Sequence, residues 1–262
     1  MIGLTSAILC TLTFGAIWHH MQTQASGKDS TRLKFIVPWT FTIVSMGIMA
    51  SAQLFTESGL NFYFYNSLFI AAFVICTILY LASLVKHVEH LGLIVLPVTL
   101  VCIALNILFS KEGSQESFSP GMQTHIIASI IAFSILGLAA VQAILLFFQD
   151  RTLRNHTNTG ILRALPSLHE SETFLFQTIS LGVVILTVAL VSGFVYIEDI
   201  FAQHLAHKTL LSSLAWVVFV ILLWGRMQFG WRGTTAIRWS LSGFTFLILA
   251  YFGSKFVLEL VL

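Results

Sequence analysis

The segment that decides the fold is the apolar run HIIASIIAFSILGLAAVQAILLFF, residues 125–148, in which His125 is the one ionisable side chain. A helix needs about 20 mostly apolar residues to cross a bilayer, and this run is long enough. The whole chain of 262 residues is similar, with 57% hydrophobic and only 9% charged residues. A soluble domain carries roughly 25% charged residues. The composition therefore predicts an integral membrane protein.

Runs of comparable length recur along the chain and are separated by short polar breaks. Eight are found, at residues 2–20, 35–54, 63–85, 91–109, 123–149, 174–197, 209–225 and 239–258. Backbone groups in hydrocarbon must be satisfied within each spanning segment, and the runs lack the alternation of barrel strands. We therefore predict an all-α, polytopic transmembrane bundle of about eight helices, which forms one integral membrane domain over residues 1–262.

The positions of the basic residues predict how these helices are oriented. Ten of the 13 Lys and Arg residues fall in alternate connections: Lys28, Arg32, Lys34, Lys86, Arg151, Arg154, Arg163, Arg226, Arg232 and Arg238. The positive-inside rule places these connections in the cytoplasm and both termini on the outer side of the membrane. The net charge is only +2, and the basic residues are not concentrated in one segment. No nucleic-acid partner is therefore expected.

The motifs of familiar soluble enzymes are not found in the sequence. No segment resembles a glycine-rich phosphate loop, a G-x-S-x-G elbow or an H-E-x-x-H zinc helix. Cys10, Cys76 and Cys102 lie inside apolar runs without metal-ligand spacing, which predicts buried packing. We expect a protein that is not an enzyme.

The predicted topology divides the nine histidines between the two membrane faces. His125, His204 and His207 fall at the outer boundary. Six others fall on the cytoplasmic side and are expected to be solvated: His19, His20, His87, His90, His156 and His169.

The outer histidines suggest a cofactor site. His125 opens one helix, whereas His204 and His207 precede another, so a bundle can bring two imidazoles to opposite sides of one cavity. Two axial nitrogens suit a six-coordinate haem iron. Two other interpretations remain open: His125 is a hydrated or hydrogen-bonded histidine at a helix end, or the outer histidines hold zinc or copper, for which their spacing is loose.

The last third of the chain carries a more specific pattern. "LAW" at residues 214–216 is followed by an apolar helix, by "GWRG" at 230–233 and by "AYFG" at 250–253. This order resembles the cytochrome c assembly proteins of the CcsA and HemX type, and most closely their inner-membrane YpjD-type branch. The resemblance extends upstream to "HLGLIVLPVTL" at 90–100 and through the helix of His125. Residues 87–262 are thus the assembly-like core, and residues 1–86 are less distinctive.

The resemblance implies haem handling at the outer face of the membrane, with a histidine on either side of a tryptophan-rich loop. His125 matches the first of these positions. The stretch "YIEDIFAQHLAHKTLLSSLAW", residues 196–216, departs from the family because it has no tryptophan before Trp216. An aromatic platform for an exposed haem edge is therefore missing. His207, and less directly His204, are candidates for the second ligand by position alone.

The basic and aromatic turn near residues 224–239 has a simpler interpretation. Arginines there are expected to bind lipid phosphates and tryptophans to anchor helix ends at the interface, while docking of a partner remains the alternative. Membrane lipid is thus one expected partner.

The sequence as a whole favours a haem-associated assembly or regulatory factor that binds haem b near the periplasmic face through His125 and His207, with haem iron as the tentative metal. The alternatives are an accessory component of membrane transport or ion homeostasis without haem, and a structural protein that stabilises a membrane protein partner.

Overall fold

The computed structural model describes residues 2–26, 31–56, 59–60, 64–109, 120–154, 165–196 and 203–253, with the side chains of 54–56, 59–60, 120, 203–207 and 252–253 outside this description. Almost all of these residues are helical, which confirms the predicted fold class. Besides turns and short connections, the described part contains a minimal antiparallel ladder between β1 (Phe55–Thr56) and β2 (Gly59–Leu60), in which Phe55 pairs with Leu60.

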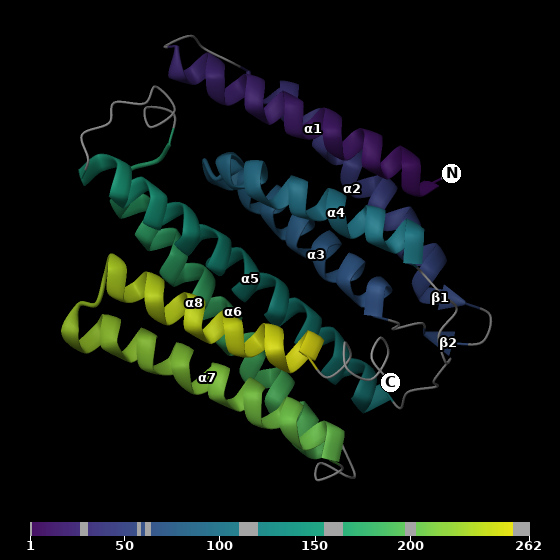
Figure 1. Cartoon of the computed structure of the whole chain (residues 1–262), viewed down its shortest axis with the longest axis vertical. Helices are drawn as coiled ribbons and strands as arrows, with labels where there is room; N and C mark the ends of the chain where they lie inside the picture. The colour runs from purple at the N-terminus through teal and green to yellow at the C-terminus, as the bar shows by residue number, and fades with distance from the viewer. Residues whose placement is uncertain are drawn as a thin grey trace. The chain divides into compact units, whose positions relative to one another are not determined.

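The chain forms two compact units. The first comprises Met1–Ser117 and Arg151–Ser167, and the second comprises Phe118–Asp150 and Leu168–Leu262. The elements of the first are α1 (Ile2–Ala25), α2 (Leu33–Leu54), β1, β2, α3 (Phe64–Val85), the short 3-10 helix η1 (Glu89–Leu91) and α4 (Gly92–Phe109) (Figure 1). Those of the second are α5 (Pro120–Arg154, whose last turn belongs to the first unit), α6 (Leu168–Tyr196), α7 (Gln203–Phe229), α8 (Thr234–Ile248) and the π-helical segment η3 (Leu249–Gly253).

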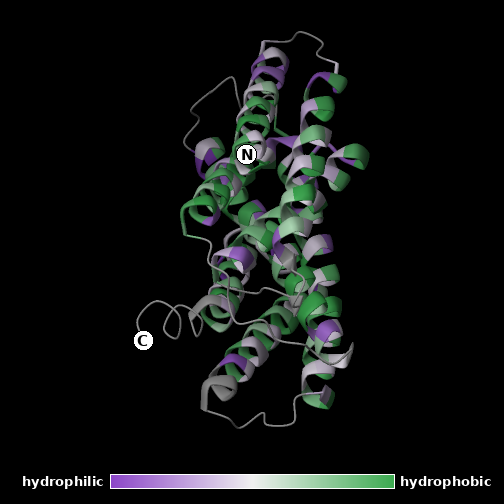
Figure 2. Ribbon diagram, turned by 90° about the vertical axis from the view of Figure 1, so that its right-hand side faces the viewer, coloured by the Kyte–Doolittle hydropathy of each residue, from purple (hydrophilic) through white to green (hydrophobic). Residues whose placement is uncertain are grey.

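Seven of the described helices, α1 to α7, are long and apolar enough to cross a membrane. Figure 2 shows hydrophobic residues along most of their length. The described part of α8 has 15 residues and continues into η3. Residues 254–258 of the eighth predicted run lie outside the described residues. The multi-pass character expected from the sequence is thereby confirmed.

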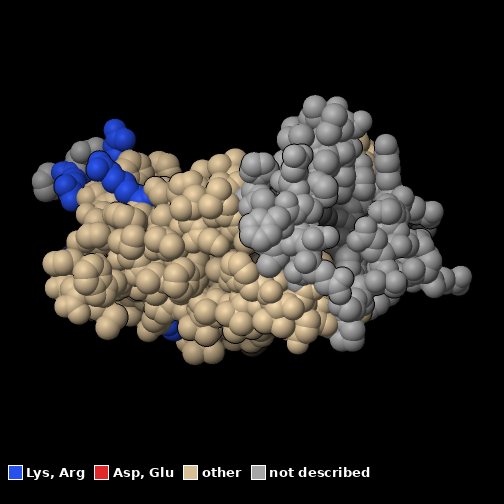
Figure 3. Space-filling model, turned by 90° about the horizontal axis from the view of Figure 1, so that it is seen from below, with Lys and Arg blue, Asp and Glu red and all other residues tan. Residues whose placement is uncertain are grey.

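The exposed faces of the helices are apolar. On α6, a stripe at helical spacing is more than half exposed: Leu181, Val184, Val188, Val191 and Val195. In water, a contiguous apolar stripe of this kind is unfavourable, whereas lipid chains match it chemically. Figure 3 shows a related distribution, since Lys and Arg gather at one end of a face that is otherwise almost uncharged where it is described. These surfaces are suited to contact with the hydrocarbon core.

Small hydroxyl side chains connect α1 to α2 inside the first unit. The hydroxyls of Ser6 and Ser45 are 2.8 Å apart, and so are those of Thr13 and Thr42. Ser6, Thr13 and Thr42 are fully buried. Hydrogen bonds between helices are one of the forces that associate them where lipid removes the hydrophobic driving force.

A chain of amide groups crosses the same unit near its other end. Gln53 of α2 donates from Nε2 to Oδ1 of Asn106 at 2.8 Å, and Asn106 of α4 donates from Nδ2 to Oδ1 of Asn66 on α3 at 2.8 Å. Asn66 and Asn106 are buried, so their amides must be satisfied by protein partners. One side chain, Asn106, thus joins three helices.

We expect Asn106→Ala to lower the free energy of unfolding by roughly 1–2 kcal/mol, because it removes two interhelical amide bonds at once. Unfolding in mixed detergent micelles measures this change. Thr40→Val is the control, since it removes a hydrogen bond between the exposed Thr40 and the half-buried Tyr80 side chains. If Asn106→Ala is as stable as the Thr40→Val control, Asn106 does not stabilise the contact between these helices.

Glycines permit two features of the second unit. A Cβ at Gly243 would lie 2.8 Å from the ring of the fully buried Phe219, so α7 and α8 pack closely because this residue has no side chain. Gly230 and Gly233 have positive φ angles of 65° and 57°, the left-handed region that glycine adopts readily. The tight turn predicted between these helices is therefore present.

Candidate functional site

His125 lies near the start of α5, where its ring packs against the last turns of α6. Its Nδ1 is 2.7 Å from the carbonyl oxygen of Ala189 and 3.5 Å from the hydroxyl of Ser192. Because a carbonyl oxygen can only accept, Nδ1 carries the hydrogen and Nε2 carries the lone pair. No hydrogen bond to Nε2 is found within the described part of the chain. The ring is therefore oriented, with Nε2 as its basic nitrogen.

The seat for this ring is made of small residues on one face of α6. Ala189, Ser192 and Gly193 follow each other at a spacing of three and four residues, which places them on the same side of a helix. A Cβ at Gly193 would lie 2.8 Å from Cε1 and 3.0 Å from Nδ1 of His125. The absence of a side chain at position 193 thus makes room for the imidazole.

The start of α7 belongs to the same neighbourhood. Lys208 is close enough to His125 to act on it electrostatically, and its Nζ lies 5.5 Å from the ring centre of Tyr251 in η3. Tyr251 stacks on Phe133 of α5, with ring centres 5.1 Å apart. Three elements of the second unit, α5, α6 and α7, therefore meet near this imidazole, and η3 contacts α5 and α7 through Tyr251.

The two predicted partners of His125 lie at the start of α7. His204 and His207 belong to this helix, but their side chains lie outside the described residues. The predicted convergence of two imidazoles therefore stays a prediction. Among the described residues, no group of three or more His, Cys, Asp or Glu side chains is arranged to hold a bare metal ion.

The histidines predicted to be solvated on the cytoplasmic side divide into two groups. His19, His87 and His169 are exposed as predicted, whereas His156 lies outside the described residues. For His20 and His90 the prediction is wrong, because their exposed fractions are only 1% and 4%. They are buried by the packing of α1 and of the α3–α4 connection, which a position near the end of an apolar run does not reveal.

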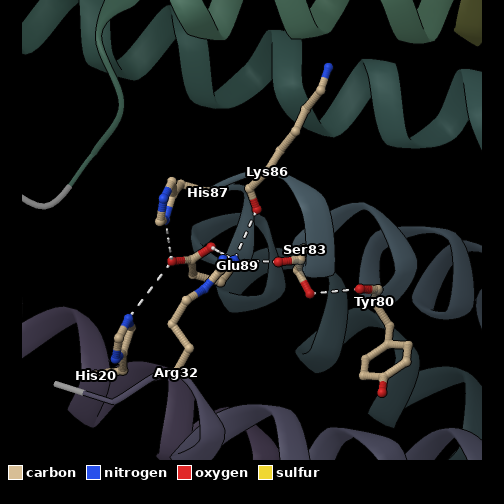
Figure 4. A network of polar contacts seen from close by, with 7 residues as sticks. All are labelled: His20, Arg32, Tyr80, Ser83, Lys86, His87 and Glu89. Atoms are coloured by element: carbon tan, nitrogen blue, oxygen red, sulfur yellow. Dashed lines mark hydrogen bonds and ion pairs between the residues drawn. The ribbon is translucent and has the colours of Figure 1, made fainter.

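His20 belongs to a polar cluster that sequence reasoning missed (Figure 4). Glu89, only 3% exposed, places Oε1 3.7 Å from Nε2 of His20 and 3.7 Å from Nδ1 of His87, and Oε2 3.5 Å from a guanidinium nitrogen of Arg32. Arg32 also donates to the backbone carbonyls of Ser83 and Lys86. The signal available in the sequence was "HVEH" at residues 87–90, which places an acid between two histidines at the end of a span.

The basic and aromatic turn between α7 and α8 is held by contacts within the second unit. Arg226 donates to the carbonyl of Trp231 at 3.2 Å and lies over the ring of Phe176. Glu172 accepts a hydrogen bond from the backbone N–H of Gly233 at 2.8 Å and lies 3.7 Å from Arg232. Trp231 and Trp239 stack, with ring centres 5.5 Å apart. The turn is an ordered surface of aromatic rings and guanidinium groups.

The apolar spans, their polar interhelical contacts and their apolar exposed faces define a polytopic helical membrane protein. The chain belongs to the cytochrome c assembly protein family, whose characteristic sequence matches residues 38–262. The resemblance expected from the sequence is thereby confirmed.

Several named proteins are similar to this chain. "Inner membrane protein YpjD" of Escherichia coli K12 is 29% identical over 233 residues, which cover 86% of this chain and 87% of that protein. "Cytochrome c biogenesis protein CcsA" of Chlamydomonas reinhardtii is 26% identical over 208 residues, which cover 74% and 58%. "Protein HemX" of Brevibacillus brevis is 24% identical over 132 residues, which cover 50% and 48%. No solved structure matches the chain significantly.

Proposed function

We propose that this protein is an inner-membrane, haem-associated assembly or regulatory factor in which His125 is an axial ligand of haem iron near the periplasmic face. The observation that supports the proposal is the hydrogen bond from Nδ1 of His125 to the Ala189 carbonyl. Histidines that bind metals almost always donate their other ring N–H to an acceptor of this kind, which sets the tautomer and the ring orientation.

The donor set of the second unit suits haem better than a bare metal ion. A porphyrin supplies four nitrogens of its own, so the protein needs to add only one or two axial ligands. When bound, haem b would supply a redox-active iron. His125 would hold it through Nε2, and His207, or else His204, is proposed for the opposite side because α7 begins close to His125.

The location and orientation are part of the same proposal. The similar Escherichia coli protein is named for the inner membrane, and we assign this chain to a bacterial inner membrane on that basis. The alternating basic connections support two periplasmic termini. The aromatic and basic turn between α7 and α8 would then face the cytoplasmic headgroups and contact membrane lipid.

The family is one of assembly proteins, and we propose that this member acts without catalysing a reaction of its own. The missing tryptophans before Trp216 distinguish it from relatives that present haem on an aromatic platform. Bound haem can instead stabilise one conformation of the protein, and a membrane protein partner can then recognise that conformation.

The visible absorption spectrum of the gently solubilised, purified protein tests the proposal. We expect a Soret band whose intensity follows the protein through size-exclusion chromatography, and extraction of haem b into acidified solvent. A pigment-free protein from cells that synthesise haem normally would contradict haem association and would favour transport or ion homeostasis.

We expect Gly193→Val to lower haem affinity by about tenfold or more, because changes in the surroundings that orient a ligating histidine have effects of this size. The added side chain would occupy the space in which the His125 ring lies. Haem titration into apoprotein measures the change. Gly15→Val is the matched control, since a Cβ at Gly15 meets nothing within 4 Å. Equal affinity in both variants would show that the seat on α6 is irrelevant.

A further inference from the structure

We propose that His20, His87 and Glu89 form a proton-binding site in the first unit, in which His87 exchanges protons with water and Glu89 passes them to the buried ring of His20. This site lies in a different unit from His125 and does not depend on haem. Its ligand is the proton, and its occupied state is a buried imidazolium paired with a carboxylate.

The two oxygens of Glu89 face different partners. Oε2 faces the guanidinium of Arg32 at 3.5 Å, and Oε1 faces His20 and His87, each at 3.7 Å (Figure 4). Arg32 is held in place by the carbonyls of Ser83 and Lys86. Arg32 thus neutralises the carboxylate from one side, and Oε1 remains the oxygen at which a proton can arrive and leave.

The two histidines differ sharply in their access to water. The side chain of His87 is 74% exposed, whereas that of His20 is 1% exposed. Glu89 lies between them with its side chain 4% exposed. A proton can therefore reach Oε1 from the aqueous phase through one imidazole and continue to the other without crossing bulk water.

His20 has unused hydrogen-bonding capacity at this depth. Both of its ring nitrogens are buried and have no hydrogen-bond partner within the described part of the chain. Buried polar atoms normally have partners, and an exception marks a place where another species binds. A separation of 3.7 Å is too long for a hydrogen bond but shortens readily when the imidazole becomes charged. A proton bound at Nε2 would therefore give His20 a charged partner in the carboxylate of Glu89.

The transfer balances in two steps. Imidazolium His87 gives the proton on Nδ1 to Oε1 of Glu89 and becomes neutral. The resulting carboxylic acid then gives that proton to Nε2 of His20, which becomes the imidazolium, and Glu89 returns to the carboxylate. Before His87 takes up a proton from water the cluster is neutral through Arg32 and Glu89, and the transfer then moves the single positive charge from His87 to His20.

The path ends at His20 because the residues beyond it are apolar. The ring contacts Phe35 at 4.8 Å between centres, and Ile17, Phe35 and Trp39 are fully buried. The site therefore loads and releases protons from one side, unlike a conducting pathway.

The remaining titratable groups near the site do not supply this route. The side chain of Lys86 points away from Glu89 (Figure 4). His90, which neighbours Glu89 in η1, is buried, and its Nε2 has no hydrogen-bond partner among the described residues. Neither group lies between Glu89 and water, whereas His87 does.

Nitrogen NMR of histidine-labelled protein in lipid nanodiscs tests the proposal, with the His20 signal assigned from its loss in His20→Gln. In the wild-type protein we expect the His20 signal to change from the neutral to the imidazolium form between about pH 8 and about pH 5. A His20 signal that stays neutral over this range would overturn the proposal without any variant.

Two variants then separate a proton site from a structural ion pair. Glu89→Gln is expected to abolish the protonation of His20 over the same range, and His87→Ala to slow proton exchange at His20 while leaving its final protonation in place. His19→Gln is the control, because His19 is the exposed neighbour of His20. Unchanged titration of His20 in Glu89→Gln, or unchanged exchange in His87→Ala, would overturn the relay. Helical circular dichroism at both ends of the pH range establishes that the variants are folded.

Discussion

His125→Ala is expected to remove most of the Soret band from the purified protein. The substitution deletes the nitrogen proposed to bind iron, and it leaves the Ala189 carbonyl on α6 without its imidazole partner. Axial ligation holds haem b noncovalently, so loss of the proposed ligand should release the cofactor during purification. The measurement is the ratio of Soret to protein absorbance after size-exclusion chromatography in the same detergent.

The matched control for this experiment is His169→Ala. His169 lies in the same unit, on α6, but is exposed. The His169→Ala variant should keep the wild-type ratio of Soret to protein absorbance. In His125→Gly, added imidazole should restore part of the band, because a free imidazole can occupy the space that the side chain leaves. A Soret band of wild-type intensity in His125→Ala would remove this residue from the site even if the protein binds haem elsewhere.

Trp39→Ala is expected to lower the free energy of unfolding by about 3 kcal/mol, since truncation of a buried aromatic residue leaves a cavity that the helices cannot fill. Trp39 is fully buried, and its indole Nε1 donates to Sγ of Cys76 at 3.4 Å. Its ring lies 5.8 Å from that of Tyr80 between centres. The residue therefore joins α2 to α3 through both packing and a polar contact.

Reversible unfolding in mixed micelles measures the effect of Trp39→Ala. Trp18→Ala is the control in the same unit, because Trp18 is 42% exposed and its removal creates no internal cavity. Trp39→Phe should recover part of the stability, since it keeps an aromatic ring but lacks the donor to Cys76. If Trp18→Ala lowers the free energy of unfolding as much as Trp39→Ala does, burial of the side chain does not determine the loss of stability.

Much of the fold follows from hydropathy. Each apolar run between residues 2 and 225 corresponds to a helix of spanning length, because hydrocarbon forces the backbone to satisfy its own hydrogen bonds. The change from α-helix to π-helix at Leu249 was not predictable, since hydropathy is blind to the hydrogen-bond register within a helix. The burial predicted for Cys10, Cys76 and Cys102 is also confirmed.

The candidate site was predictable in part. The place of His125 at the start of a span and its family resemblance single it out in the sequence. The hydrogen-bond partner of His125 could not be predicted from the sequence, because the acceptor is the backbone carbonyl of Ala189, 64 residues away, and every residue type carries such a group. Gly193 is one of 17 glycines, and the ring against its Cα distinguishes it only in the folded chain.

Taken alone, the sequence determined that this is a helical membrane protein of the cytochrome c assembly family. Hydropathy and local motifs can be recognised within one span at a time, without knowledge of how the spans pack. The tertiary structure alone decided which ionisable groups are removed from water. His19 and His20 are adjacent in the chain, yet one is exposed and the other is buried beside Glu89. The physical reason is that a helix turns neighbouring side chains to different faces, and only the packing of α1 against the α3–α4 connection makes one of those faces an interior.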